Sequence, residues 1–343
     1  MLFDAKPAYY RRVIIKCIGG KQMNNWLNKT LKKLYRKIVP DAIQFELLRY
    51  RNYEQYITEK PRRKQRNQQR KEIIRFLRTE LKSHKDSEKQ NIVNFLKRNR
   101  FIILPYEFVK KYNRDNVVVY TDSNMKYVLH DNKRMYFPSN WTEGRVKGYY
   151  TWLLAEQDGD SPHHYETAGF HVRDEDIVAD IGAAEGIFAL SVVEKVKKIY
   201  LFECETAWSE ALERTFEPWK DKVTIVNRYI SDCTDNTSIT LDEFLDGSKI
   251  DFIKGDIEGA EIKLLAGAKE TLAKERNLRI VLCTYHREND QRDLDRMLKE
   301  SGFQTEFSKG FMIYINDKKL GPPYLRRALI RATKSEVLSS QPL

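Results

Sequence analysis

The stretch from residue 176 to 205 constrains the fold of this chain more than any other. It begins with a short apolar run ending in Asp180, passes through a turn that contains Gly182 and Gly186, and continues with apolar residues at helical spacing. A second apolar run ends at Glu203. This order predicts a strand, a tight turn, a helix and a parallel strand. Two acidic residues would then meet at the edge where open α/β sheets bind ligands.

The chemistry of the turn favours a nucleoside ligand without phosphates. The two glycines let the backbone approach a ligand, and Glu203 is placed to accept hydrogen bonds from ribose hydroxyls. A dinucleotide site normally shows G-x-G-x-x-G, whereas this turn reads D-I-G-A-A-E-G and places Glu185 where a phosphate would be repelled. These features indicate S-adenosylmethionine as cofactor, with Ala183 and Cys204 as further candidate contacts.

The alternation of strands and helices continues along the rest of the chain. Strands are expected at residues 177–181, 199–202, 223–226, 250–254 and 278–283, with helices at 185–196, 206–216, 260–274 and 290–301. Residues 303–307 and 311–315 read as a final antiparallel pair. We therefore predict a doubly wound α/β sheet of seven strands in which only the last runs antiparallel, the Rossmann-like scaffold of class I methyltransferases.

Charge divides the chain into two unlike parts. Residues 1–150 hold 35 Lys and Arg against 14 Asp and Glu, a net charge of +21, so the remainder carries −9 of the total +12. We expect a basic, mainly helical module with a short β-hairpin over residues 1–145, followed by the catalytic domain over 146–343. No stretch resembles a membrane span or a signal peptide, and the four cysteines are widely spaced. A cytoplasmic protein with reduced thiols is expected.

Several segments of the basic module have readable patterns. An amphipathic helix is expected at residues 26–39, and further helices at 41–57, 72–81 and 88–99. Short strands are expected at 117–120, 126–130 and 135–137, and a helix at 146–157 follows the module. Between Lys60 and Lys71 stand seven bases and no acid. This run could grip phosphates, an anionic glycan or a membrane surface. Because it lacks interleaved aromatic residues, we favour a solvated helix face or linker.

Candidate catalytic groups follow the fourth and fifth strands of the sheet. Methyl transfer needs an aligned acceptor and, for a hydroxyl, a group that takes the proton. Asp256 and His286 stand at the same sheet edge as the cofactor turn, and His286 has a near-neutral intrinsic pKa. Glu258 could contribute or could cap the following helix. These three groups could also hold a divalent ion, although such sets are common without one, and we predict no metal.

Other loop residues inform the acceptor. His163, His164 and Tyr165 precede the first sheet strand and could line the mouth of the cofactor site, although most polar loop residues bind nothing. Enzymes that methylate the amino groups of adenine or cytosine carry (Asp/Asn)-Pro-Pro-(Tyr/Phe) after the fourth strand, where this chain reads G-D-I-E. The Pro-Pro-Tyr at 322–324 is expected after the last strand. A hydroxyl acceptor is therefore favoured.

Four segments resemble the FkbM family of methyltransferases, namely D-I-G-A-A-E-G (180–186), F-E (202–203), I-T-L-D-E-F (239–244) and K-G-D-I-E-G-A-E-I-K-L-L-A-G-A (254–268). The resemblance spans roughly residues 161–334. It implies a class I fold, S-adenosylmethionine as cofactor and O-methylation of a saccharide, glycoconjugate or related natural product. It also implies that Asp180, Gly182 and Gly186 bind the methionine end, Glu203 the ribose and Asp232 the adenine, with Asp256 at the reaction centre.

Two other functions are compatible with the sequence. The basic amino-terminal half could bind nucleic acid, which would make the protein an RNA methyltransferase, although we consider a small-molecule or glycan acceptor the better reading. The chain could instead be a scaffold whose first 140 residues bind a partner or a membrane surface. The sequence does not identify the acceptor or the oligomeric state, because acceptor pockets are built from loops that carry no general code.

Overall fold

The computed structural model describes residues 64–315, 317 and 320–334. The helices predicted at 26–39 and 41–57 and the first four residues of the basic run lie outside this part. The chain divides into two compact units, residues 1–69 and 70–343, and the description below concerns the second. Within the described residues, every helix is too short or too polar to cross a membrane.

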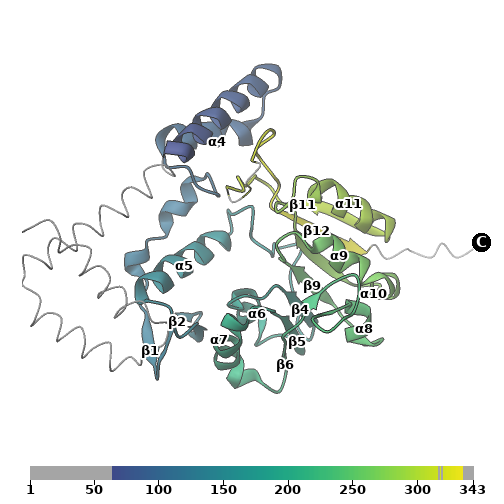
Figure 1. Cartoon of the computed structure of the whole chain (residues 1–343). Coiled ribbons are helices and arrows are strands. Elements are labelled where there is room, and N and C mark those ends of the chain that lie inside the picture. Colours follow the sequence, from purple (N-terminus) through teal and green to yellow (C-terminus); the bar gives the residue numbers. More distant parts are fainter. Residues whose placement is uncertain (1–63, 316, 318–319, 335–343) are drawn as a thin grey trace, which may run out of the picture. The chain divides into compact units, whose positions relative to one another are not determined.

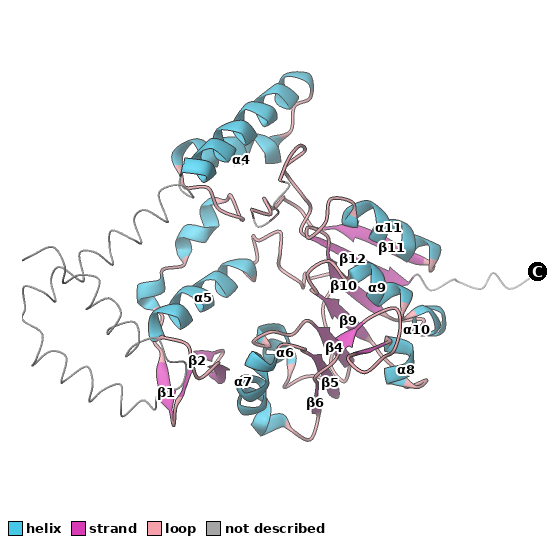
Figure 2. Cartoon of the chain, in the orientation of Figure 1, coloured by secondary structure: helices cyan, strands magenta, loops and turns pink. Residues whose placement is uncertain are grey.

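A seven-stranded sheet forms the centre of this unit, as predicted (Figure 2). Its strands lie in the order β11-β12-β10-β9-β4-β5-β6. Their bounds are β4 Ile177–Ile181, β5 Lys198–Phe202, β6 Val223–Val226, β9 Phe252–Gly255, β10 Arg279–Cys283, β11 Phe303–Phe307 and β12 Leu329–Lys334. Strand β12 pairs antiparallel with both β10 and β11, while the pairs from β10 through β6 are parallel. The carboxyl ends of β4, β5, β9 and β10 therefore share one edge.

The last strand is not the predicted one. Residues 311–315 are apolar but pack Ile313 into a cluster with the helical pair that precedes the sheet, and Met312 bridges to Arg326. The strand β12 was hidden because its central Arg331 interrupts the apolar pattern. The guanidinium of Arg331 is buried and donates to the Tyr165 carbonyl oxygen. The Pro-Pro-Tyr segment thus precedes the last strand instead of following it.

Helices cover both faces of the sheet (Figure 1). One face packs against α5 Glu143–Glu156, α6 Ile187–Val192 and α7 Thr206–Phe216, and the other against α8 Leu241–Leu245, α9 Glu261–Ala266, α10 Lys269–Lys274 and α11 Asp290–Glu300. The helix predicted at 260–274 is split at Gly267. A Cβ there would lie 2.1 Å from the Ser231 carbonyl oxygen, so the chain must turn at a residue without a side chain.

The part of this unit before α5 contains helices and a small sheet. Residues 70–83 are helical, and α4 (Ser87–Arg98) and the short 3-10 helices Glu107–Lys111 and Arg114–Asn116 follow. An antiparallel sheet follows, formed by β1 (Tyr120–Asp122), β2 (Met125–His130) and β3 (Lys133–Phe137). A separate pair of strands, β7 (Tyr229–Ile230) and β8 (Ser238–Ile239), lies later in the chain, after β6.

The small sheet and the large sheet share one hydrophobic core. The backbone N–H of Tyr136 in β3 donates to the Thr215 hydroxyl of α7 at 2.9 Å, and Phe137 is fully buried in the same cluster as Val178. The small sheet therefore packs with the large one, and a domain boundary at residue 145 stays a prediction.

Candidate active site

A cavity of about 660 Å³ lies at the shared carboxyl edge of the strands. Seven of the predicted site residues line it, two or three from each of three strand ends: Gly182, Ala183, Glu185, Glu203, Cys204, Asp256 and Glu258. Four others are not in its lining: Asp180, Gly186, Asp232 and His286. Residues predicted at three strand ends thus meet at one cavity, and the four exceptions show how the edge is built.

Two glycines shape the turn after β4. Gly182 has φ +76°, and a Cβ on it would lie 1.9 Å from the Asp256 carbonyl oxygen. Gly186 has φ +78°, and its Cβ would lie 2.8 Å from the Phe216 ring. A left-handed backbone together with such close approach requires glycine. Gly182 thus lets the turn pack directly on the loop after β9.

Glu203 holds this turn in place. Its carboxylate accepts the Ala184 backbone N–H at 2.8 Å and the Glu205 backbone N–H at 2.7 Å. Each oxygen keeps a second lone pair, because a carboxylate offers about four acceptor positions. Glu203 can therefore fix the turn and still accept hydrogen bonds from a ligand in the cavity.

Asp180 lies beneath the turn and acts through Lys254. Asp180 is fully buried, and its carboxylate lies 2.9 Å from the Lys254 ammonium, which also donates to the Gly182 carbonyl oxygen at 2.7 Å. Burial alone would lower the pKa of Lys254, but the charges of Asp180 and Asp256 raise it, so the ammonium stays charged. Sequence analysis missed Lys254, although a lysine inside an apolar strand was a usable signal.

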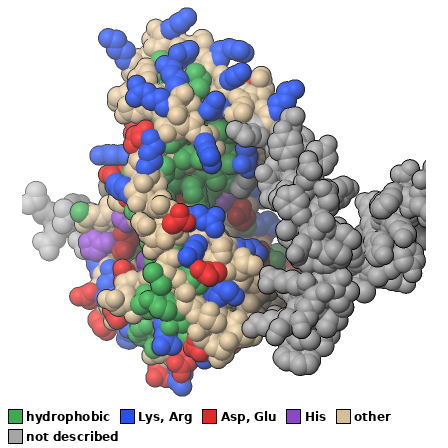
Figure 3. All heavy atoms as spheres, turned by 90° about the vertical axis from the view of Figure 1, so that its left-hand side faces the viewer, with side chains coloured by type: hydrophobic (Ala, Val, Ile, Leu, Met, Phe, Trp, Pro, Cys, Tyr) green, Lys and Arg blue, Asp and Glu red, His purple; other side chains and the backbone are tan. Residues whose placement is uncertain are grey.

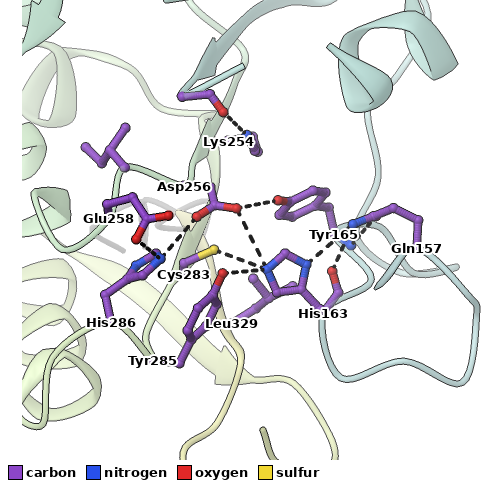
Figure 4. A network of polar contacts seen from close by, with 12 residues as sticks. Gln157, His163, Tyr165, Lys254, Asp256, Glu258, Cys283, Tyr285, His286 and Leu329 are labelled. Atoms are coloured by element: carbon purple, nitrogen blue, oxygen red, sulfur yellow. Dashed lines mark hydrogen bonds and ion pairs between the residues drawn. The ribbon is translucent and has the colours of Figure 1, made fainter. Parts of the chain in front are cut away.

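Asp256 is the centre of a polar network at the wall of the cavity (Figure 4). One carboxylate oxygen accepts the Tyr165 hydroxyl at 3.0 Å, and the other lies 3.4 Å from Nε2 of His286. Nε2 of His163 lies 3.8 Å from the first oxygen. Burial acts to raise the pKa of Asp256, but the charges of Lys254 and the histidines outweigh it and lower the pKa to about 2.

His286 stands behind Asp256, oriented by a carboxylate. Its Nδ1 lies 3.0 Å from Glu261 Oε1, while Nε2 points toward Asp256 and, at 3.7 Å, toward Glu258. Burial acts to lower the pKa of His286, but the hydrogen bond to Glu261 and the neighbouring carboxylate charges raise it. The Glu258 side chain is 82 % exposed and accepts the Tyr314 hydroxyl at 3.1 Å. It therefore does not cap α9.

The second histidine is more deeply buried than the sequence suggested. His163 contacts the Tyr285 hydroxyl at 3.2 Å and Cys283 Sγ at 3.6 Å, and burial lowers its pKa to about 4. It is therefore neutral and supports the network from behind. Of the three loop residues proposed to line the mouth, Tyr165 lines the cavity, whereas His163 does not.

The helix α5 supplies a wall that sequence analysis missed. Tyr149, Trp152, Glu156 and Gln157 line the cavity from one face of this helix. Burial, joined by the charge of Asp256, raises the pKa of Glu156 to about 8. The i, i+3, i+7 spacing of these residues was a readable signal of one face, but nothing in the sequence indicated that the face meets the sheet edge.

Glu185 is a second carboxyl of the cavity lining with a raised pKa. It accepts the Tyr149 hydroxyl of α5 at 2.8 Å, and burial raises its pKa to about 7. The carboxyl groups of Glu185 and Glu156 thus change charge near neutral pH.

The remaining predicted groups have other surroundings. Asp232 is exposed, accepts the Ser231 hydroxyl at 3.0 Å and lies 3.6 Å from the Lys263 ammonium. Its contact with adenine stays a prediction. Among the described residues, Asp256, Glu261 and His286 each offer a ligand atom within 4.8 Å of one another, as do Asp256, His163 and Cys283. The absence of a metal likewise stays a prediction.

The family model described as the methyltransferase FkbM domain matches residues 220–305. This span includes β6, β9, β10 and the start of β11, and therefore also Asp256, Glu258 and His286. No curated protein matches the chain in sequence.

Three solved structures show how distant the similar folds are. The methyltransferase FkbM from Methylobacillus flagellatus KT is 18% identical with a TM-score of 0.39, covering 56% of this chain and 53% of that chain. The precorrin-6y C5,15-methyltransferase from Geobacter metallireducens GS-15 is 16% identical with a TM-score of 0.35, covering 48% and 82%. An rRNA methylase from Streptococcus thermophilus is 18% identical with a TM-score of 0.33, covering 48% and 89%.

The chain spans about half the length of the first of these structures. The resemblance predicted from the sequence is confirmed over residues 220–305, which match the model of the methyltransferase FkbM domain. These residues form part of a seven-stranded Rossmann-like sheet.

Proposed function

We propose that this protein is an S-adenosylmethionine-dependent O-methyltransferase that acts on an uncharged hydroxyl of a saccharide, glycoconjugate or related natural product. The observation that carries the proposal is the pairing of Asp256 with His286, at 3.4 Å, on the wall of a cavity that also contains the glycine turn and Glu203. Asp256 lines the cavity and His286 lies directly behind Asp256, so a ligand site adjoins a proton-accepting pair, as methyl transfer to a hydroxyl requires.

The lining of the cavity fits the cofactor. Glu203 has free lone pairs for the ribose hydroxyls, and Cys204 follows it toward the adenine. The turn at Gly182 and Ala183 would meet the methionine end, and the Glu185 carboxylate would pair with its ammonium group. When bound, S-adenosylmethionine supplies an electrophilic methyl group on a sulfonium.

The protein's own groups would handle the acceptor hydroxyl. Asp256, with its pKa near 2, is ionised and can accept a hydrogen bond from the hydroxyl, but it is too weak a base to keep the proton. His286 has a raised pKa, and its Nδ1–H is directed to Glu261, which leaves Nε2 free to take the proton. With S-adenosylmethionine bound, an O–CH₃ bond would form as the S–CH₃ bond breaks, and the hydroxyl proton would pass by way of Asp256 to His286.

The charges of the lining favour an uncharged acceptor. Six carboxyl groups line the cavity: Glu156, Glu185, Glu203, Glu205, Asp256 and Glu258. Among the described residues, the only bases in the lining are Lys254 and Arg228, and both already donate to backbone carbonyl oxygens. An anionic group inside the cavity would meet repulsion without a free cation to offset it. An RNA acceptor would have to keep its phosphates outside.

Calorimetry with S-adenosylhomocysteine tests the cofactor assignment. Glu203→Ala removes charge-assisted hydrogen bonds worth about 1.5–3 kcal/mol each, so its dissociation constant should rise roughly tenfold to a hundredfold. Glu210→Ala removes the same charge from an exposed side chain of α7 that is not in the cavity lining, and it should change the dissociation constant little. An unmodified protein that binds neither this compound nor S-adenosylmethionine would refute the proposal.

Transfer of a labelled methyl group to neutral saccharides tests the assignment of the base. His286→Asn should lower the rate by roughly 10²–10⁴, the usual contribution of a positioned general base. Binding of S-adenosylhomocysteine should stay unchanged, because His286 is outside the cavity lining. A variant with full transfer activity would remove His286 from the mechanism.

A further inference from the structure

A stripe of four cations runs along the helix of residues 70–83. It consists of Lys71, Arg75, Arg78 and Lys82, which follow one another at helical spacing and are all exposed. At 3.6 residues per turn they fall within an arc of about 60°. We call these four residues the basic stripe. In Figure 3, Lys and Arg side chains gather over the upper part of the molecule, where this helix and α4 lie.

The opposite side of this helix is fixed to the rest of the unit. Ile73 and Leu77 are fully buried in a cluster with Leu96 of α4. Arg70 donates to the Asn99 carbonyl oxygen at 2.8 Å, and Lys89 pairs with Glu80 at 3.0 Å, so the two helices are joined at both ends. The basic stripe is therefore presented by a packed helix with a defined outward face.

The cations of the basic stripe have no acidic partners in the part of the chain that the structure describes. Over residues 70–100, ten Lys and Arg stand against four Asp and Glu. Solvated cations normally alternate with acids along a helix face, where pairs at i, i+4 stabilise it. A one-signed stripe gives up that stabilisation and creates a positive field that attracts an anionic partner.

The spacing and surroundings of the stripe narrow the kind of partner. Lys71 and Lys82 are separated by about 16 Å along the helix, so a cation recurs about every 5.5 Å. A duplex nucleic acid presents a linear array of comparable or higher density, with one phosphate per roughly 1.7 Å of axis. A bilayer spreads its charges over a plane, and surface-bound helices usually insert an apolar face. Here that face is buried in the core.

Exposed aromatic and apolar residues are also missing from this surface. The large exposed apolar side chains of the described residues are Val118, Tyr120, Leu129 and Tyr229, all outside residues 70–100. Single-stranded nucleic acids are usually held by stacking of bases on aromatic rings. Contacts to the phosphate backbone need only cations and carry no sequence preference.

We infer that the basic stripe binds the phosphate backbone of a duplex nucleic acid, without sequence specificity. This binding surface is separate from the acidic cavity and is independent of the function proposed above. Lysine and arginine neutralise phosphates and release condensed counterions, so affinity should depend steeply on salt concentration.

Fluorescence anisotropy of a labelled RNA duplex, titrated with the full chain at several salt concentrations, tests this inference. Each neutralised phosphate contributes about −0.9 to the slope of log K against log salt. Lys71→Ala/Arg78→Ala should therefore make the slope shallower by about 1.8. Between roughly 50 and 200 mM salt, the affinity of the variant for the duplex should therefore fall about 12-fold less than the affinity of the unmodified protein. Because both substituted side chains are exposed, we expect the variant to fold normally.

Arg276→Ala/Lys309→Ala is the matched control, because it removes two exposed cations from other parts of the described surface. It should leave the slope as in the unmodified protein. Three results would each overturn the inference: no duplex binding at low salt, an equal change of slope in the control, or a loss of binding to phosphatidylserine vesicles in the stripe variant while duplex binding is unaffected. Failure here leaves cofactor binding untouched, so the two proposals are tested separately.

Discussion

Replacing Lys254 by methionine should destabilise the protein strongly, because it leaves Asp180 buried without its cation. Asp180 is 0% and Lys254 4% exposed, and their charged atoms lie 2.9 Å apart. Methionine has a similar volume, so packing changes little. Removing one partner of a buried ion pair costs about 3–5 kcal/mol, most of it from the uncompensated charge that remains.

Thermal denaturation followed by circular dichroism measures this cost. At roughly 2–4 °C per kcal/mol for a domain of this size, the melting temperature should fall by about 6–20 °C. Lys254→Met/Asp180→Asn, which removes both charges, should recover most of the loss, so the two substitutions should be strongly non-additive.

Lys249→Met is a suitable control. Lys249 also pairs with an aspartate, Asp251, at 2.6 Å, but its side chain is 64% exposed, and Asp251 keeps a hydrogen bond from the Ile177 N–H. The stability change should stay below about 1 kcal/mol, as for other surface pairs. If Lys254→Met costs no more than the control, or if the double variant is no more stable than the single one, the reasoning about the buried pair is wrong.

Three further outcomes follow from the site. Glu261→Gln should lower the raised pKa of His286. The rising limb of kcat/KM against pH requires neutral histidine, so it should move to lower pH in this variant. An unmoved limb would exclude Glu261 as the residue that positions His286. Gly182→Ala should destabilise by more than the 1–2 kcal/mol of a left-handed residue because of the added clash, whereas Gly148→Ala, in an open helical position, should stabilise by up to about 1 kcal/mol in thermal melts. Burial raises the pKa of Glu185 to about 7, and its ionised form would pair with the ammonium group of the cofactor. The affinity for S-adenosylhomocysteine, measured by calorimetry, should therefore fall as the pH drops through 7. Glu185→Gln should abolish this pH dependence.

The parallel part of the sheet was predictable because its strands are continuous apolar runs bounded by turn residues. The strand β4 and the helix α7 occupy the predicted residues. The last strand was not predictable, because Arg331 makes it look polar while the apolar residues 311–315 look like a strand. The deciding facts are tertiary: Arg331 donates to a carbonyl oxygen in a distant loop, and Ile313 packs against the helical pair.

In the site, too, some residues were predictable from the sequence and others were not. Residues directly after strands, such as Glu203 and Asp256, were found because the ends of parallel strands meet at one edge. Their contacts with other side chains were not predicted: Glu261 reaches His286 from the first residue of α9, and Tyr165 reaches Asp256 from a loop 91 residues earlier. Sequence patterns locate a sheet edge, but they carry no information on which distant side chain approaches it.

The separate origin of the α5 wall has a consequence for how this protein could change its substrate. Glycine turn, Glu203 and Asp256 all come from strand ends, whereas Tyr149, Trp152 and Glu156 come from one helix that precedes the sheet. Under the proposed function, the first group meets the cofactor and the hydroxyl, and the second meets the rest of the acceptor. A few substitutions on one face of α5 would then alter acceptor range while the reaction chemistry stays intact, so the helix is the natural place to diversify or engineer this enzyme.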